Sequence, residues 1–290
     1  MSVILITGSN SGIGMATALH LTEKGHRVYA SMRDLKRGDN LQAAAQDKNL
    51  SIEIVQLDVN DESSIKKAVA DVLSKENQID VLVNNAGIGP LGTIEEIDDA
   101  SAKAVFETNF FGALRTIRAV LPKMREQKSG TIVNVSSVAG RLAPFCCGIY
   151  SASKFALEAA SEALAQEVVP YNIRVRIVEP GFIITPILQT AIDTLSAAEN
   201  SPYADSLERS KIIYSQGVQN GGEPSQVAEA IEAAINSTDL TLRFLVGASA
   251  APLLEGRNKM TDEEWIAMQR HSSHEDYFGE FAARFPMPAH

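Results

Sequence analysis

Short runs of apolar and β-branched residues alternate along the chain with longer segments in which apolar residues recur at helical spacing. The runs near residues 3–7 and 79–83 are almost continuously apolar, as expected for strands buried on both faces of a sheet. Strands separated by helices favour a parallel sheet covered on both faces. We predict strands at 3–7, 27–31, 52–57, 79–83, 131–136, 173–178 and 243–247, with helices near 13–24, 38–46, 61–76, 101–127, 151–169 and 224–236.

Two segments depart from this alternation. Residues 186–222 are rich in Ser, Ala and Asn and end in a glycine pair. A connection of this length is often a lid or binding loop, and the alternative is an ordinary surface loop. In the tail, the run from Thr261 to Glu264 matches a capping box. We predict one catalytic domain over residues 1–250, with a substrate loop at 186–222, and a C-terminal extension over residues 251–290 that packs on the domain or on a partner subunit.

Composition narrows the class of partner. The 26 basic and 36 acidic residues give a net charge of −10, which argues against nucleic acid. The two cysteines, Cys146 and Cys147, are adjacent and offer no disulfide framework, which suits a reducing compartment. The chain has no apolar run of about 20 residues and no signal-peptide pattern. We therefore expect a cytoplasmic protein with a small-molecule substrate and no membrane span.

A tyrosine and a lysine four residues apart provide the first candidate chemistry. Tyr150 and Lys154 lie in a predicted helix, so their side chains share one face. A free tyrosine loses its proton only near pH ~10, and a neighbouring ammonium lowers that pKa by favouring the phenolate. The pair can therefore exchange a proton with a carbonyl or hydroxyl. Such spacing also arises by chance on helix surfaces, so other features must decide between the two readings.

The first predicted strand leads into a glycine turn, TGSNSGIG, which contains Gly8, Gly12 and Gly14. Glycines here allow close approach of the backbone to a diphosphate, and the following helix directs its N-terminal amides at the phosphates. The spacing differs from the common G-x-G-x-x-G fingerprint, and a plain turn is the alternative.

Further candidate residues follow other predicted strands. Asp58 closes the third strand, NNAG ending at Gly87 follows the fourth, and the pair Pro180-Gly181 follows the sixth, with Thr185 beyond it. Open α/β sheets bind ligands at the carboxyl ends of their strands. These segments are therefore expected to converge on one site.

Taken in order, TGxxxGIG, NNAG, an asparagine, a serine, YxxxK and PG-x-x-x-T resemble the motifs of the short-chain dehydrogenase/reductase family. The resemblance covers residues 3–247. It implies a single Rossmann-type doubly wound α/β domain with a seven-stranded parallel sheet, a nicotinamide cofactor, and interconversion of carbonyls and alcohols without a metal. Segments such as VYASMRDLKR and YSASKFALEAASEAL resemble the hydroxysteroid and retinol branch of the family.

The resemblance also implies a role for each catalytic residue. Tyr150 is similar to the family's general acid/base, and Lys154 to the residue that lowers the tyrosine pKa and holds the nicotinamide ribose. Ser137, thirteen residues before the tyrosine, is similar to the serine that hydrogen-bonds the substrate oxygen. Asn109 is similar to the asparagine that holds a kinked helix and a proton-relay water. All four residues are present, which disfavours the alternative of a non-catalytic NADP(H)-sensing regulator.

Cofactor contacts are implied at the glycine turn and at the ends of the strands. In the family, the residue matching Asp58 meets the adenine, those matching Asn85 and Gly87 line the adenosine, and those matching Ile183 and Thr185 contact the nicotinamide carboxamide. The implied cofactor residues are Gly8, Ser11, Gly12, Ile13, Gly14, Arg33, Asp58, Val59, Asn85, Ala86, Gly87, Tyr150, Lys154, Pro180, Gly181, Ile183 and Thr185.

The end of the second predicted strand bears on the choice of cofactor. NAD-preferring proteins usually carry an acidic residue there, whereas this chain has Arg33, with Lys36 and Arg37 close behind. A guanidinium suits a 2′-phosphate, and Ser11 adds a hydroxyl. We expect NADP(H). One alternative is NAD(H), because Asp34 is close by. Another is that Arg33, Lys36 and Arg37 only form the solvent-exposed start of a helix.

The segments that flank the substrate in relatives are apolar in this chain. They predict a bulky apolar ketone or alcohol such as a steroid or retinoid, although the same residues could belong to the core. The predicted substrate residues are Ser137, Phe145, Cys147, Phe182 and Leu188. Helices 101–127 and 151–169 form the dimer interface in relatives, so the resemblance implies a homodimer or homotetramer.

Overall fold

The computed structural model describes residues 1–196 and 201–287, so parts of the predicted substrate loop and of the C-terminal extension lie outside the described residues. Its centre is a seven-stranded sheet with the order β3-β2-β1-β4-β5-β6-β7, in which every pairing is parallel. This confirms the predicted fold class. The strands are β1 (Val3–Ile6), β2 (Arg27–Met32), β3 (Glu53–Gln56), β4 (Val81–Asn84), β5 (Gly130–Val135), β6 (Ile173–Pro180) and β7 (Arg243–Val246).

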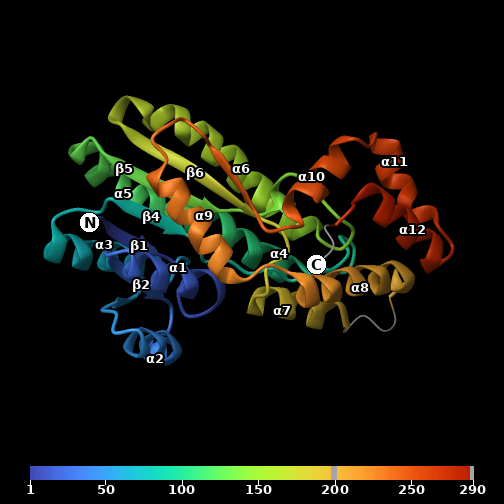
Figure 1. Ribbon diagram of the computed structural model, residues 1–290, viewed down its shortest axis with the longest axis horizontal. Coiled ribbons are helices and arrows are strands. Elements are labelled where there is room, and N and C mark those ends of the chain that lie inside the picture. Colours follow the sequence, from blue (N-terminus) through green and yellow to red (C-terminus); the bar gives the residue numbers. More distant parts are fainter. Residues whose placement is uncertain (197–200, 288–290) are drawn as a thin grey trace.

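Helices cover both faces of the sheet (Figure 1). Side chains alternate between the two faces along a strand, so Val3 and Leu5 of β1 belong to one apolar core while Ile4 and Ile6 belong to the other. The first core includes residues of α3 (Glu62–Glu76), α5 (Ala113–Gln127) and α6 (Gly148–Val168), and the second includes residues of α1 (Gly12–Glu23), α2 (Asp39–Asp47) and α9 (Pro224–Asn236).

The helix predicted at 101–127 is interrupted. It consists of α4 (Asp99–Phe106), a π-helical segment (Glu107–Gly112) and α5. A π-helical turn widens the helix locally and is frequent at functional sites. The interruption agrees with the kink implied for the segment around Asn109.

Buried side chains tie the helices to the strands beneath the site. The Asn84 side chain of β4 donates to Asn134 Oδ1 of β5 over 2.8 Å, and the Asn134 amide donates to Ser161 Oγ of α6, also over 2.8 Å. From α5, Thr116 Oγ1 donates to Asn84 Oδ1 over 2.6 Å. Buried polar groups are costly unless paired, so this chain of bonds fixes α5 and α6 against the sheet.

The connection after β6 is helical rather than an irregular loop. It contains α7 (Pro186–Ser196) and α8 (Ala204–Asn220), which pack against each other. Its two ends are joined by a parallel bridge between Ile183 and Gly222, which lie outside the strands of the sheet.

The C-terminal extension packs on the domain itself. It contains α10 (Ala250–Asn258), α11 (Asp262–Ala267) and α12 (His274–Arg284), and its apolar residues share a buried cluster with Val138, Leu142 and Phe182. The predicted capping box is present, because Glu264 N–H donates to Thr261 Oγ1 and Thr261 N–H donates to the Glu264 carboxylate. Figure 1 shows these helices at the opposite end of the long axis from α1 and α2.

Candidate active site

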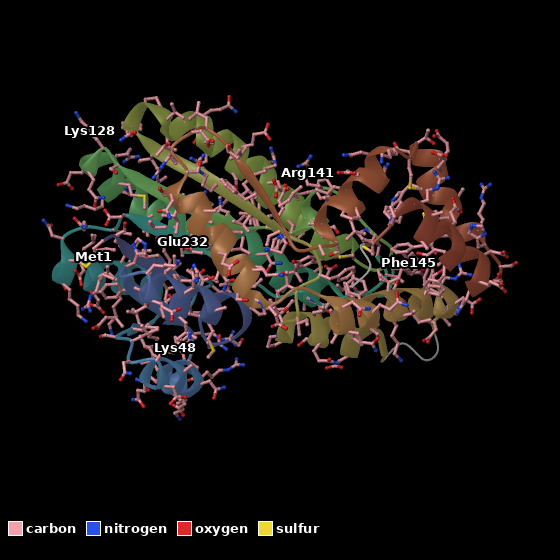
Figure 2. All side chains as sticks on the ribbon, viewed as in Figure 1. Met1, Lys48, Lys128, Arg141, Phe145 and Glu232 are labelled. Carbon is pink, nitrogen blue, oxygen red and sulfur yellow. The ribbon has the colours of Figure 1, made fainter. Side chains whose placement is uncertain are left out.

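One large cavity of about 1350 Å³ lies at the carboxyl ends of the strands. It runs from the glycine turn, past α6, to the C-terminal helices (Figure 1). Figure 2 labels Lys48 near α2 and Phe145 on the side of the molecule that carries the C-terminal helices. Apart from Gly14 and Asn109, all the site residues predicted from the sequence line this cavity. The sheet therefore brings together segments that are up to about 180 residues apart in the sequence.

The glycine turn leaves no room for side chains at two positions. Gly8 has a φ of +69°, and a Cβ there would lie 2.9 Å from Ala86 Cα. A Cβ on Gly14 would lie 2.3 Å from the Gly8 carbonyl oxygen and 2.5 Å from Asn85 Nδ2. Gly14 therefore serves close packing of α1 against the turn rather than contact with a ligand.

Thr7 holds the turn against the NNAG segment, a role that the sequence analysis missed. Its hydroxyl oxygen accepts hydrogen bonds from the backbone N–H groups of Asn85 and Ala86, each over 3.0 Å. The Asn85 amide in turn donates to the carbonyls of Thr7 and Gly8. The sequence feature that could have indicated this role is a threonine directly before the first glycine, at the end of a buried strand.

The residues at this end of the cavity fit a dinucleotide. Helix α1 begins at Gly12, and the side chain of its N-cap residue, Ser11, makes no capping hydrogen bond, so the first-turn amides stay available to an anion. Arg33 and Arg37 line the same region, beside Asp58. A helix start with free amides next to guanidinium groups offers positive charge to phosphate groups such as those of a dinucleotide.

The two residues at the centre of the cavity come from α6. Tyr150 and Lys154 both line the cavity, and the Lys154 ammonium lies 5.7 Å from the centroid of the Tyr150 ring. The Lys154 side chain is buried, and its Nζ donates to the Val135 carbonyl at the end of β5 over 2.9 Å. The predicted one-face arrangement of the pair is therefore present.

The electrostatics of the pair differ from the sequence-based expectation. Burial raises the pKa of Tyr150 above its ordinary value, and the nearby Ser137 hydroxyl only partly opposes that rise. Burial also lowers the pKa of Lys154 to about 8, although the Glu158 carboxylate favours the ammonium. In this structure the Tyr150 pKa is therefore raised by burial rather than lowered as expected from Lys154.

Ser137 stands at the end of β5 and begins a short 3-10 turn, Val138–Gly140. Its hydroxyl oxygen accepts from the Ala139 N–H over 3.1 Å and donates to the Pro180 carbonyl over 3.4 Å. The serine therefore sits between the ends of β5 and β6, next to Tyr150.

Asn109 lies behind the cavity wall rather than in it. Its side chain is buried in the π-helical segment, where it exchanges two hydrogen bonds of 2.9 Å with the backbone of Ile88. The same amide donates to Ser153 Oγ of α6 over 3.1 Å. Asn109 thus fixes the segment after β4 against the helix that carries Tyr150 and Lys154.

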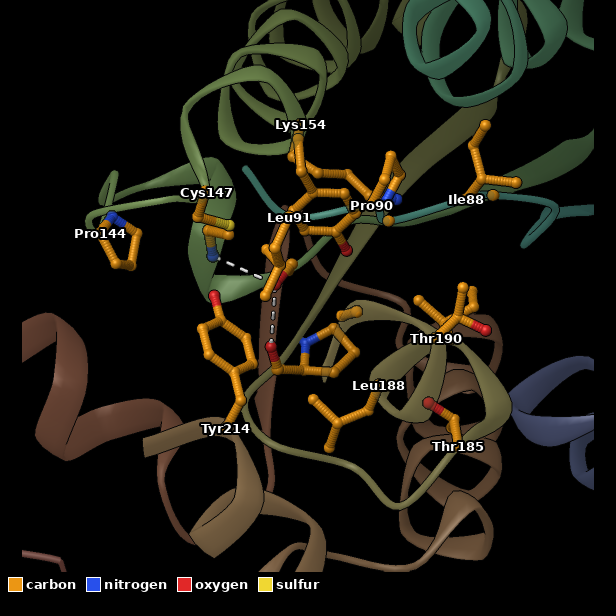
Figure 3. Close-up of a pocket in the computed structure, with 18 of the residues that line it drawn as sticks. Ile88, Pro90, Leu91, Pro144, Cys147, Lys154, Thr185, Leu188, Thr190 and Tyr214 are labelled. Carbon is orange, nitrogen blue, oxygen red and sulfur yellow. Dashed lines mark hydrogen bonds between the residues drawn. The ribbon is translucent and has the colours of Figure 1, made fainter. Parts of the chain in front are cut away.

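The far half of the cavity is mostly apolar, as predicted. Figure 3 shows Cys147, Leu188 and Tyr214 around the pocket, with the Tyr214 hydroxyl pointing into it. The rings of Phe182 and Tyr214 meet edge to face, with centroids 5.6 Å apart. Cys147 is a free, buried thiol whose pKa is raised by burial, so it contributes as a small apolar side chain.

The C-terminal helices supply a wall that the sequence analysis did not foresee. The sequence feature that could have indicated this wall is the spacing of three or four residues between apolar side chains in the tail. Such spacing indicates buried helix faces. The wall consists of Leu253, Trp265, Ile266, Met268, Gln269, Tyr277, Phe281 and Phe285.

Two other kinds of feature are absent from residues 1–196 and 201–287. No group of three or more His, Cys, Asp or Glu side chains there is placed to hold a metal ion. No helix in this part of the chain is long and apolar enough to cross a membrane.

Comparison with known proteins identifies the class. The family model of the short chain dehydrogenases matches residues 2–196, and the chain therefore belongs to the short-chain dehydrogenase/reductase family. Its members are NAD(P)(H)-dependent enzymes that act on CH–OH and C=O groups. A crystal structure of a short-chain dehydrogenase from Streptomyces avermitilis superposes with a TM-score of 0.78 at 36% identity, covering 93% of this chain and 97% of that one.

Three curated relatives illustrate the range of activities nearby. The 3-ketodihydrosphingosine reductase of Bacteroides thetaiotaomicron is 38% identical over 229 residues, which are 79% of this chain and 81% of the relative. Human retinol dehydrogenase 8 is 36% identical over 261 residues, covering 86% and 83% of the two chains. Human 17-beta-hydroxysteroid dehydrogenase type 1 is 32% identical over 296 residues, covering 98% and 88%.

Proposed function

We propose that the chain interconverts a ketone and a secondary alcohol on a bulky apolar substrate, such as a steroid, retinoid or long-chain ketone, with NADP(H) as cofactor. The observation that carries this proposal is the continuity of the cavity. One space joins an anion-binding helix start, the Tyr150–Lys154 pair and an apolar far wall. A ligand at one end and a ligand at the other therefore meet beside the tyrosine.

The proposed chemistry divides between cofactor and protein. When bound, the nicotinamide supplies or accepts a hydride at the carbon that bears the substrate oxygen. Tyr150 moves the proton at that oxygen, Ser137 donates a hydrogen bond to it, and Lys154 binds the ribose and keeps a positive charge near the phenol. The raised pKa of Tyr150 keeps the phenol protonated at neutral pH, which suits proton donation to a ketone better than proton removal from an alcohol. Asn109 positions the residues around the pair.

The preference for NADP(H) is supported by the charges beside the glycine turn. Arg33 and Arg37 line the cavity there, and the Asp34 carboxylate already accepts the backbone N–H of Lys36 as a helix cap. A carboxylate engaged in capping is less free to hold a ribose hydroxyl. The two guanidinium groups suit a 2′-phosphate.

The substrate class is supported by the far wall and by the relatives. The three relatives are named for activities on 3-ketodihydrosphingosine, retinol and 17-beta-hydroxysteroids, all of which carry a large apolar skeleton. The apolar residues of α7, α8 and the C-terminal helices form a wall of matching character. The cytoplasmic location and the homodimer or homotetramer stay predictions.

The test is a spectrophotometric screen of the purified protein. Oxidation of NADPH and NADH is followed with steroid, retinoid, long-chain aliphatic and small polar carbonyls, and the reverse reaction with the matching alcohols. We expect turnover with NADPH and apolar ketones. Tight NADPH binding without turnover of any carbonyl or alcohol would instead support the non-catalytic sensor.

A further inference from the structure

The wall formed by the C-terminal helices carries one polar atom without a partner. Around it the cavity is lined by Trp265, Met268, Phe281 and Phe285, all of which present apolar surface. Gln269, which follows α11, also lines the cavity, and its Oε1 atom is buried with no hydrogen-bond partner among the described residues. A buried acceptor without a donor is costly, so such an atom on a cavity wall marks a position where a ligand donor is favoured.

A second polar group lies beside it. The burial that raises the pKa of Tyr277 is opposed by its interaction with the Gln269 side chain, which places the two side chains next to each other. The Arg209 guanidinium of α8 stacks over the Tyr277 ring at 4.9 Å and donates to the His271 carbonyl over 2.6 Å. These contacts fix the phenol, so Gln269 and Tyr277 form a rigid polar patch in an apolar wall.

The patch and the reacting groups stand on different walls of one cavity. Gln269 and Tyr277 come from the C-terminal helices and Tyr150 from α6, and all three line the cavity. A substrate whose carbonyl meets Tyr150 would therefore reach the patch with another part of its skeleton. Ligand sites of this kind use a few polar groups in an apolar surface to set the orientation of the ligand.

The chemistry of the patch selects the ligand group. Gln269 and Tyr277 are uncharged and can both donate and accept hydrogen bonds. A hydroxyl also does both, so it satisfies Gln269 Oε1 without bringing a charge into an apolar wall. A ligand carboxylate has no proton to donate to Gln269 Oε1, and a ligand ammonium would lie near the Arg209 guanidinium, which carries the same charge.

We propose that Gln269, with Tyr277 beside it, binds a hydroxyl group at the end of the substrate remote from the reacting carbon. The inference rests on the proposed oxidoreductase function and deepens it, because it adds a second polar requirement to an otherwise apolar substrate. Substrates that lack the remote hydroxyl leave the acceptor unpaired and are bound more weakly.

The test compares ω-hydroxy methyl ketones of increasing chain length with their unhydroxylated parents. Dissociation constants are measured by calorimetry in the presence of NADPH, and kcat/KM is measured by NADPH oxidation. We expect one chain length at which the wild-type protein prefers the hydroxylated ketone by about tenfold, the ratio that corresponds to one net hydrogen bond. Gln269→Leu should abolish that preference, and Tyr277→Phe should reduce it.

The matched control is Gln216→Leu, at an exposed glutamine on α8, which should retain the wild-type preference. Gln269→Met provides a second apolar variant should Gln269→Leu fail to fold. An equal preference in wild type and both Gln269 variants, or no preference at any chain length, overturns the inference. Turnover without a hydroxyl preference leaves the oxidoreductase function standing, whereas a hydroxyl preference in binding without turnover supports the patch and refutes that function.

Discussion

Glu158 lies one helical turn beyond Lys154 on α6, and both side chains are buried on the helix face that carries Tyr150. One carboxylate oxygen of Glu158 accepts from Arg243 Nε of β7 over 3.0 Å, and the other has no hydrogen-bond partner among the described residues. The Glu158 carboxylate stabilises the Lys154 ammonium. It therefore raises the pKa of Lys154, against the lowering caused by burial.

Further charged groups surround Glu158. Glu179 of β6 is buried nearby, and its pKa is raised by burial and by the Glu158 charge. Arg243 lies 3.4 Å from Glu179 and Arg141 lies 3.2 Å from it, while Glu162 of α6 pairs with Arg243 at 2.8 Å. Two arginines thus face three carboxylates behind Lys154.

Replacing Glu158 should change the pH dependence of activity. The pKa of Lys154 is about 8, so activity that needs the ammonium falls as the pH rises through that value. Glu158→Gln removes the charge that holds this pKa up, and the alkaline limb of the kcat/KM profile should move to lower pH by roughly one unit. The profile is measured with ketone and NADPH concentrations below their KM values.

The control for this variant is Glu162→Gln. It also removes a partner of Arg243, but its side chain is 57% exposed and it lies two turns from Lys154. It should leave the alkaline limb in place, as expected for a surface ion pair. An equal displacement in both variants would mean that Glu158 acts only through Arg243.

Tyr150→Phe should remove most turnover and leave cofactor binding nearly intact. The ring and its packing persist while the proton donor is lost, and general acid–base catalysis typically contributes about 10²–10⁴-fold. The measurements are kcat and the NADPH dissociation constant from fluorescence. Full activity in this variant would refute the assignment of Tyr150 as the acid/base.

The candidate site residues at the ends of strands could be predicted from the sequence, because each lies in a short local motif. Such motifs include the glycine turn, Asp58 and the Tyr150–Lys154 spacing. They meet at one site because the carboxyl ends of parallel strands lie at the same edge of the sheet. The seven strands could also be predicted, because each is a short apolar run that lies between segments with helical spacing of apolar residues.

The far wall could not be predicted in this way. Gln269 and Tyr277 reach the cavity only because the C-terminal helices fold back over Val138 and Phe182, and no local motif encodes that contact. The raised pKa of Tyr150 was missed for a related reason, because desolvation depends on tertiary packing rather than on the residue four positions away.

Arg33→Glu should weaken NADPH far more than NADH. The substitution places a carboxylate where a 2′-phosphate is expected, and we predict a loss of at least about tenfold in NADPH affinity, equivalent to ~1.4 kcal/mol. NADH should be affected little, since it lacks the phosphate. Lys67→Glu, at an exposed lysine of α3, controls for the change in net charge. Equal weakening of both cofactors would contradict the 2′-phosphate contact.

Gly14→Ala should destabilise the turn and abolish cofactor binding together. A methyl group there would lie 2.3 Å from the Gly8 carbonyl oxygen, which is backbone and cannot move without shifting α1 or the turn. We expect a loss of roughly 1–3 kcal/mol in the free energy of unfolding, measured by urea denaturation, with NADPH affinity measured alongside. Gly279→Ala on α12 is the control, because a Cβ there meets no atom within 4 Å and alanine favours the helix. It should leave stability unchanged or raise it slightly. Wild-type stability and NADPH affinity in Gly14→Ala would show that the turn relaxes freely, contrary to the packing seen around Gly8 and Asn85.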